Sequence, residues 1–179
     1  MQQKTEKATF AGGCFWCQDA VFRMLKGVKS VVAGYSGGDL EQPTYSQVSS
    51  GRTGHMEAVQ IEYDPSQVSY NDLLSVFWAS HNPTQQGGQG ADLGSQYEAA
   101  ILYHTDEQKK LAEKSKKVLQ DQKIYDRPIV TKILPFKNFW PAEDYHQNYY
   151  IKNPNVSYCK IVINPKVEKV KKMFGEKLI

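Results

Sequence analysis

The chain has 179 residues, of which 40% are hydrophobic and 23% are charged. This length predicts one domain over residues 1–179 with a sizeable core, and the composition is typical of soluble globular proteins. A formal charge of +3 gives no electrostatic basis for binding nucleic acid or an anionic membrane. The lysines after Lys109 and around Lys169 are interpreted as solvated helix faces.

The sequence carries neither an apolar run of the roughly 20 residues that span a bilayer nor the apolar core of a secretory signal. We therefore expect a cytoplasmic protein, and we expect it to be a monomer. The 3 cysteines are a poor basis for a disulfide framework. Two of them form the motif Cys14-Phe15-Trp16-Cys17, which in a reducing compartment indicates redox chemistry or metal binding.

Hydrophobic periodicity predicts alternating strands and helices in the first half of the chain. Strands are expected over 7–10, 28–35, 56–63 and 98–103, and helices over 14–25 and 69–81. Ser69 and Asp72 resemble a capping box at the start of the second helix. Two glycine-containing stretches, 36–54 and 82–96, are predicted to be long loops, which in compact domains often carry function.

The second half is predicted to add a polar helix capped by Thr105 and ending near Gln120, followed by a shorter set of elements. These are a strand over 129–134, a short helix over 142–151, a strand over 157–163 and a final helix that starts at Pro165. The order over 7–103 is that of a split βαβ unit. We therefore expect an α+β fold with a ferredoxin-like core, additional helices and long active-site loops.

Cys14 follows a predicted strand and a Gly-Gly turn, and it begins a predicted helix. Free backbone N–H groups and the positive end of the helix dipole stabilise a thiolate at this position. Cys17 lies one turn later on the same face, within reach of a disulfide. A Cys-x-x-Cys pair can also be half of a zinc site, with Cys159 and a distant histidine as further ligands, or two buried small residues. Redox catalysis is favoured over both.

The residues around Cys14 and six further segments resemble the peptide methionine sulfoxide reductases of the A type. The similarity spans about Ala8 to Lys160. The matching segments, in order, are Gly13-Cys14-Phe15-Trp16, Gly34-Tyr35-Ser36-Gly37-Gly38, Pro43-Thr44-Tyr45, Gly54-His55-Met56-Glu57-Ala58-Val59, Phe77-Trp78, Asp92-x-Gly94-Ser95-Gln96-Tyr97 and Glu143-Asp144-Tyr145-His146-Gln147.

The resemblance implies reduction of methionine S-sulfoxide, free or in proteins, by a mixed α/β domain that needs no cofactor or metal. It implies that Cys14 attacks the sulfoxide sulfur and becomes a sulfenic acid, which a second cysteine converts to a disulfide for thioredoxin to reduce. It assigns an acid role to Glu57 and hydroxyl donors to Tyr45 and Tyr97. Asp92 would orient the polar side of the substrate, and Phe15 and Trp16 would hold its S-methyl group.

Without the resemblance, each of these residues has a simpler interpretation. Glu57 would be a solvent-facing strand carboxylate, Tyr45 and Tyr97 loop packing, and Asp92 a turn residue. Phe15 and Trp16 would be core residues, and His146 is interpreted as stabilising a loop. The chain also departs from many relatives, with Cys17 in place of a glycine and Asp19 in place of a glutamate. Asp19 is expected in a local salt bridge or cap.

Two residues compete for the resolving role. Cys17 is the nearer by sequence and is favoured, whereas Cys159 follows Asn153-Pro154 and Tyr158 at a position that resolves the disulfide in many relatives. A relay through both stays open. Two other functions are weighed: a thioredoxin-like dithiol–disulfide oxidoreductase, whose strand order the predicted strands over 28–35 and 56–63 do not fit, and a zinc-stabilised binding module.

Overall fold

The computed structural model describes residues 4–179, and four strands form the centre of its main sheet. They are β1 (Glu6–Ala11), β2 (Val28–Ser36), β3 (Met56–Tyr63) and β6 (Ala100–Tyr103). Their order is β6-β1-β3-β2, and every neighbouring pair is antiparallel. Helix α1 (Phe15–Phe22) follows β1 and α3 (Tyr70–Ser80) follows β3. The predicted α+β fold with a ferredoxin-like split βαβ core is confirmed.

Two short strands extend this sheet to six, and a separate hairpin lies beyond one end of it. Strand β7 (Lys132–Pro135) pairs in parallel with β6, and β8 (Trp140–Pro141) pairs with β2. The hairpin is formed by β4 (Gly88–Gln89) and β5 (Asp92–Leu93). Between β6 and β7 runs α4 (Asp106–Asp121), whose first turn is capped by the Thr105 side chain as predicted.

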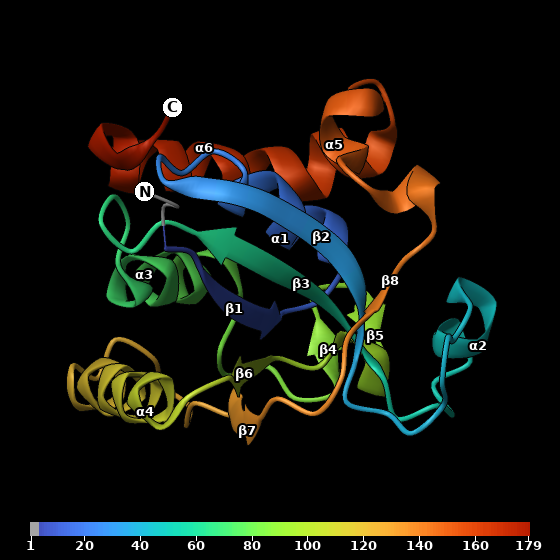
Figure 1. The fold of residues 1–179 in the computed structure, drawn as a ribbon, viewed down its shortest axis with the longest axis horizontal. Coiled ribbons are helices and arrows are strands. Elements are labelled where there is room, and N and C mark those ends of the chain that lie inside the picture. The colour runs from blue at the N-terminus through green and yellow to red at the C-terminus, as the bar shows by residue number, and fades with distance from the viewer. Residues whose placement is uncertain (1–3) are drawn as a thin grey trace.

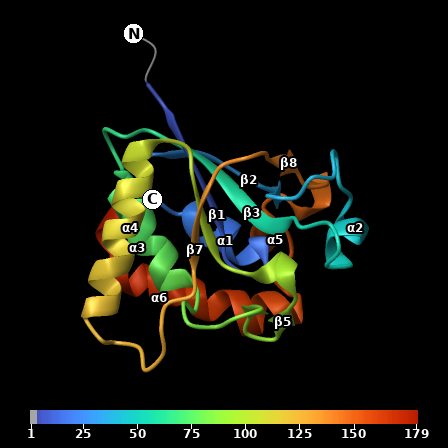
Figure 2. The same ribbon diagram turned by 90° about the horizontal axis from the view of Figure 1, so that it is seen from below.

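Helices α1 and α3 form a layer on one face of the sheet, and α6 (Asn164–Phe174) lies across both of them (Figures 1 and 2). The main core lies between these layers. The ring of Phe10 on β1 stacks at 5.3 Å from Phe22 and 4.9 Å from Phe77, and burial of each such ring contributes roughly 1.5–3 kcal/mol. A smaller cluster on the opposite face of the sheet is covered by Phe136 and Phe139.

The predicted strand over 157–163 is wrong, because this segment is helical. The chain is helical from residue 157, makes a π-helical turn at Cys159–Ile163 and continues directly into α6. Its buried residues Cys159, Ile163, Val167 and Val170 recur at helical spacing, so packing overrides the β-propensity of this stretch. Pro165 would clash with the carbonyl of Ile161 in a regular α-helix, and the wider turn removes that clash.

The predicted loops and the predicted helix over 142–151 contain shorter elements. Helix α2 (Tyr45–Ser49) lies within 36–54, and Thr44 and Gln47 form a capping box at its start. The stretch 142–151 is divided into a 3-10 turn (Asp144–His146) and α5 (Tyr149–Lys152). The predicted strand over 129–134 begins only at Lys132. Asp19 forms the expected salt bridge, at 2.6 Å from Arg23.

His81 ends α3 as a buried, neutral imidazole, and this makes the stability of the fold dependent on pH. Its Nδ1 lies 2.6 Å from the Phe77 carbonyl and its Nε2 lies 2.8 Å from the Thr131 hydroxyl. Burial lowers the pKa of His81 to about 4. The unfolded chain, with a histidine pKa near 6.5, therefore binds the proton first as the pH falls.

We expect His81 to cost the folded state up to about 3 kcal/mol as the pH falls from about 6.5 to about 4. The variant His81→Gln should lose less stability over this interval than the wild-type chain, although it starts from a lower value. Urea unfolding at a series of pH values measures both slopes. Equal slopes for the two chains would contradict the buried neutral state.

Candidate active site

Cys14 lies at the N-terminal end of α1, where the turn after β1 places it. Gly13 has a φ of 80°, and a Cβ there would lie 2.7 Å from the Cβ of Gln89, so only glycine fits. Cys14 is the N-cap residue of α1 and is 9% exposed. Its side chain lines a depression of about 1070 Å³ whose wall also includes Asp92 and Tyr158.

The expected thiolate is not the resting state of Cys14. Burial, which is the largest effect, and then the charges of Glu57 and Cys17 raise the pKa of the thiol well above its ordinary value. A backbone bond from Trp16, of the kind that the helix position predicted, and a bond from the Tyr158 hydroxyl lower it by less. The prediction of a depressed pKa is therefore wrong, because the sequence did not reveal how deeply the sulfur is buried.

Glu57 faces the start of α1 from the middle of β3. It lies directly opposite Tyr35 of β2 in the strand pairing, is 2% exposed and accepts a hydrogen bond of 3.0 Å from the backbone N–H of Phe15. Burial raises the pKa of Glu57 to about 8, against the lowering effect of the Phe15 bond. Glu57 is thus a carboxylic acid at neutral pH, and the simpler interpretation as a solvent-facing carboxylate does not hold.

Tyr45 and Tyr97 come to this site from the two long connections. Tyr45 is the first residue of α2, and Tyr97 ends a 3-10 turn (Ser95–Tyr97) that follows β5. Both side chains are partly buried. Burial first, and then the charge of Glu57, raise the pKa of each phenol, so both remain hydroxyl donors at neutral pH. The structure therefore brings Cys14, Glu57, Tyr45 and Tyr97 together.

Phe15 and Trp16 differ in how much of their surface they leave free. Phe15 is 1% exposed and packs against the rings of Tyr35 and His146. Trp16 is partly buried and stacks on Tyr149 with ring centroids 3.6 Å apart. Its indole N–H donates to Nδ1 of His146 at 3.1 Å. Trp16 therefore keeps some accessible surface next to Cys14, whereas Phe15 lies in the core beneath it.

The two candidate partners of Cys14 are both buried in the main core cluster, but they lie on different helical segments. Cys17 is one turn further along α1, and its backbone N–H bonds the Cys14 carbonyl at 3.1 Å. Cys159 is 0% exposed, within the main core cluster and in the π-helical turn. All three thiols are free. Burial raises the pKa of both Cys17 and Cys159, and the charge of Lys166 partly offsets this for Cys17.

Three residues of the site have contacts that the sequence did not reveal. The Tyr158 hydroxyl donates to Asp92 at 2.6 Å and lies 4.0 Å from the Cys17 sulfur. His146 packs against Tyr45 with ring centroids 4.6 Å apart. Glu143 accepts bonds from the Tyr35 hydroxyl at 2.9 Å and the Tyr45 backbone N–H at 3.1 Å. Only their places in the sequence could have pointed to them: Glu143 and His146 lie in a segment that matches the family, and Tyr158 lies next to Cys159.

Glu143 connects β2 to the start of α2, and its removal should disturb both. The variant Glu143→Ala leaves the fully buried Tyr35 hydroxyl without its acceptor, at a cost of about 1–3 kcal/mol. It also frees the backbone at Tyr45. We expect a lower melting temperature together with reduced activity, and Glu143→Gln should retain more of both because its amide oxygen can still accept. The melting temperature and the turnover rate of the two variants test this expectation. Equal losses in Glu143→Ala and Glu143→Gln would contradict it.

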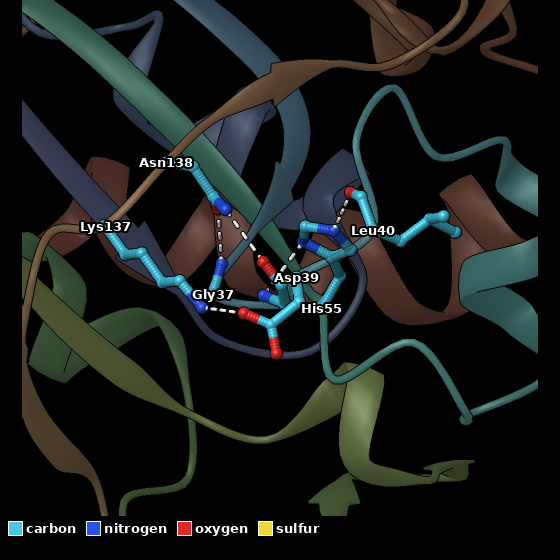
Figure 3. A network of polar contacts seen from close by, with 7 residues as sticks. Gly37, Asp39, Leu40, His55, Lys137 and Asn138 are labelled. Atoms are coloured by element: carbon cyan, nitrogen blue, oxygen red, sulfur yellow. Dashed lines mark hydrogen bonds and ion pairs between the residues drawn. The ribbon is translucent and has the colours of Figure 1, made fainter.

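The chain that leads to Tyr45 is held by a polar network around His55 (Figure 3). Nδ1 of His55 accepts from the Gly38 N–H at 3.1 Å, and its Nε2 lies 2.7 Å from the Leu40 carbonyl. Asn138 bonds Gly37 and Gly38, and Lys137 forms an ion pair with Asp39. This network ties the 37–40 segment, at the start of the long connection that carries α2, to the chain before β8.

Neither a metal-ligand cluster nor a membrane-spanning helix is found in the part of the chain that the structure describes. Within residues 4–179, no three side chains of histidine, cysteine, aspartate or glutamate are grouped so that they could hold a metal ion. None of the helices described is both long enough and apolar enough to cross a bilayer.

Comparison with known proteins identifies the family. The family model described as peptide methionine sulfoxide reductase matches residues 6–178. The chain is 52% identical to the peptide methionine sulfoxide reductase MsrA of Haloquadratum walsbyi, covering 97% of this chain and 99% of that protein. It is 51% identical to an MsrA of Thermus thermophilus, covering 94% of this chain and 95% of that protein.

Solved structures of methionine sulfoxide reductases have the same fold as this chain. Reduced Mxr1 of Saccharomyces cerevisiae superposes with a TM-score of 0.82 at 32% identity, covering 89% of this chain and 91% of that one. Methionine sulfoxide reductase A of Corynebacterium diphtheriae gives 0.76 at 34% identity, covering 86% and 77%. Mxr1 in complex with Trx2 has the same fold, with 0.59 at 24% identity, covering 83% and 87%. The chain belongs to the family of A-type peptide methionine sulfoxide reductases.

Proposed function

We propose that this chain reduces the S epimer of methionine sulfoxide, free or within a polypeptide, to methionine, with Cys14 as the nucleophile. The observation that carries the proposal is the pairing of a largely buried thiol at the edge of a depression with a buried carboxylic acid. Cys14 lines the depression, and Glu57, with a pKa raised to about 8, bonds the N–H of the next residue. A nucleophile and a proton donor are thus held side by side.

The first step moves one oxygen atom and returns every proton. The Cys14 sulfur attacks the sulfoxide sulfur while Glu57 donates its proton to the sulfoxide oxygen, where negative charge would otherwise build up. The carboxylate so formed accepts the proton that the Cys14 thiol loses. The hydroxyl group on the substrate sulfur then moves to the Cys14 sulfur. The substrate S–O bond and the S–S bond made in the attack both break, a bond between the Cys14 sulfur and the oxygen forms, and methionine leaves with Cys14 as a sulfenic acid. A thiol that is neutral at rest suits this step, because its proton is needed.

The neighbouring side chains orient the two ends of the S–O bond. Tyr45 and Tyr97, whose phenols stay protonated, donate to the developing oxyanion, a type of stabilisation worth about 3–4 kcal/mol for one donor. The Trp16 ring provides an apolar face for the S-methyl group, with Phe15 behind it. Asp92, held by the Tyr158 hydroxyl, receives the polar backbone of the substrate.

Cys17 is the resolving cysteine in this proposal. It lies on the same helix as Cys14, one turn away, so a disulfide needs only a local change at the start of α1. Cys159 is as buried as Cys17, but it lies on a different helical segment, so its place in the chain does not hold it beside Cys14. The Cys17 thiol condenses with the sulfenic acid, releasing water, and a dithiol reductant then restores both thiols by exchange. Thioredoxin is the reductant implied by the family, and Mxr1 has been solved with Trx2.

The deciding experiment measures methionine formed in a single turnover from each purified sulfoxide epimer, and then in the presence of thioredoxin. Wild-type protein should consume the S epimer and leave the R epimer. Cys17→Ser should complete the first turnover but fail to recycle, whereas Cys159→Ser should recycle normally. Loss of recycling in Cys159→Ser alone would transfer the resolving role to Cys159, and no methionine from either epimer would overturn the function.

The three free thiols suit a reducing compartment, and on this ground we propose the cytoplasm as the location.

A further inference from the structure

The depression beside Cys14 is lined mostly by residues outside the group proposed to contact the methionine side chain. Besides Cys14 it is lined by the end of α3, the chain 82–92, residues 124–127 and the helical segment 161–169. Its volume of about 1070 Å³ exceeds the upper end of the roughly 300–1,000 Å³ typical of sites for whole small molecules. Figure 2 shows the chain between α3 and β5 running alongside α6. We call this feature the Cys14 groove.

The Cys14 groove has an apolar rim and unpaired cations. Ile124 and Ile161, which both line it, are 64% and 73% exposed. Among the described residues, Lys166, Lys169 and Arg127 line the groove and make no hydrogen bond or ion pair, whereas Lys171, elsewhere on α6, pairs with Glu168. The solvated helix face that the sequence predicted around Lys169 therefore borders the candidate active site.

The charges in the groove lining are mostly positive. Lys166 and Lys169 of α6 both line the groove, and the charge of each lowers the pKa of His81 in its wall. The opposing acids are Asp92, which lies at the Cys14 end and is bonded by Tyr158, and Asp126 beside Arg127. The three cations therefore outnumber these two acids in the groove lining, and a ligand would complement the excess positive charge with carboxylates.

We propose that the Cys14 groove holds the polypeptide that flanks an oxidised methionine, and that Lys166, Lys169 and Arg127 favour flanks carrying acidic residues. The inference rests on the proposed function, because it assigns to the reaction a polypeptide substrate class. Apolar side chains of the flank contact Ile124 and Ile161, and its carboxylates lie near the three cations. Such exposed charge contacts are weak singly and are screened by salt.

The test compares matched synthetic peptides with one methionine S-sulfoxide, in which the residues on one side are aspartate, asparagine or lysine. The measured quantity is the second-order rate constant for methionine formation in a single turnover without thioredoxin, which isolates the substrate step from recycling. At low salt we expect the aspartate peptides to exceed the lysine peptides by about three- to tenfold on at least one side of the methionine. This ratio should fall toward one in Lys166→Gln/Lys169→Gln and at high salt.

The variant Lys172→Gln is the matched control, because Lys172 is an exposed, unpaired lysine of α6 outside the groove; it should keep the wild-type ratio. For each variant the rate with the aspartate peptide is divided by the rate with the lysine peptide, so a general loss of activity cancels. Equal rates for all peptides, or a double variant that changes only recycling by thioredoxin, would overturn the inference. Free methionine sulfoxide is turned over by the wild-type chain in either case, and only its failure would count against the proposed function.

Discussion

Replacing Cys14 by serine is expected to abolish methionine formation even in the first turnover. A serine hydroxyl is a far poorer nucleophile toward sulfur than a thiol, and it cannot store the transferred oxygen as a sulfenic acid. The loss should reach at least about 10⁴-fold, which is the scale seen when an enzyme loses its nucleophile. Methionine released by reduced protein, quantified after rapid quenching, provides the measurement.

The fold should survive this change, because serine is slightly smaller than cysteine and position 14 keeps its cap geometry at the start of α1. A melting temperature close to that of the wild-type chain would show this. Cys17→Ser is the matched control, since it removes a second buried sulfur from the same helix and should still release one methionine per chain. First-turnover activity in Cys14→Ser would assign the attack to another residue.

The variant Glu57→Gln should reduce the rate of the first step by roughly 10²–10⁴-fold, the usual contribution of a positioned acid. Glutamine keeps an oxygen that can accept the Phe15 N–H, but it has no proton to donate. In the wild-type chain the acid form of Glu57 is present below a pH of about 8 and disappears above it. The rate should therefore fall as the pH rises through about 8, and this limb of the profile should be missing in the variant.

The pH dependence of the free energy of unfolding provides a second test of the protonation state of Glu57. Because the folded pKa of about 8 lies above the unfolded value near 4.3, the folded chain binds the proton more strongly. Stability is therefore full below about pH 4 and declines as the pH rises to about 8, by up to roughly 5 kcal/mol. Glu57→Gln should lose less stability on this rise, and parallel curves in urea unfolding would show that the carboxyl is not held as an acid.

Local patterns in the sequence were enough to predict the centre of the fold. Alternating residues located β3 over Met56–Tyr63, and the capping box at Ser69 and Asp72 located the start of α3. The segment before α6 was mistaken for a strand, because Ile161, Val162 and Ile163 favour strands locally, while their helix is stabilised by packing on α1. Such long-range packing cannot be inferred from one local stretch.

The residues of the candidate site were predicted from the sequence, but their protonation states were not. Resemblance pointed to Cys14, Glu57, Tyr45, Tyr97 and Asp92, and the fold brings them together. The protonation of Cys14 and Glu57 depends on burial, which no motif encodes. The role of Tyr158 was also missed, because its bond to Asp92 joins residues 66 positions apart.

The pairing of Glu57 with Tyr35 across β2 and β3 restricts how this family member can vary. Side chains alternate between the two faces of a strand, so inserting or deleting one residue in β3 ahead of Glu57 would turn its carboxyl to the face lined by Phe136 and Phe139. The connection between β2 and β3 has no such alternation to preserve. Length changes should therefore accumulate near its exposed Leu40–Gln42 bend and be absent from the strands on either side.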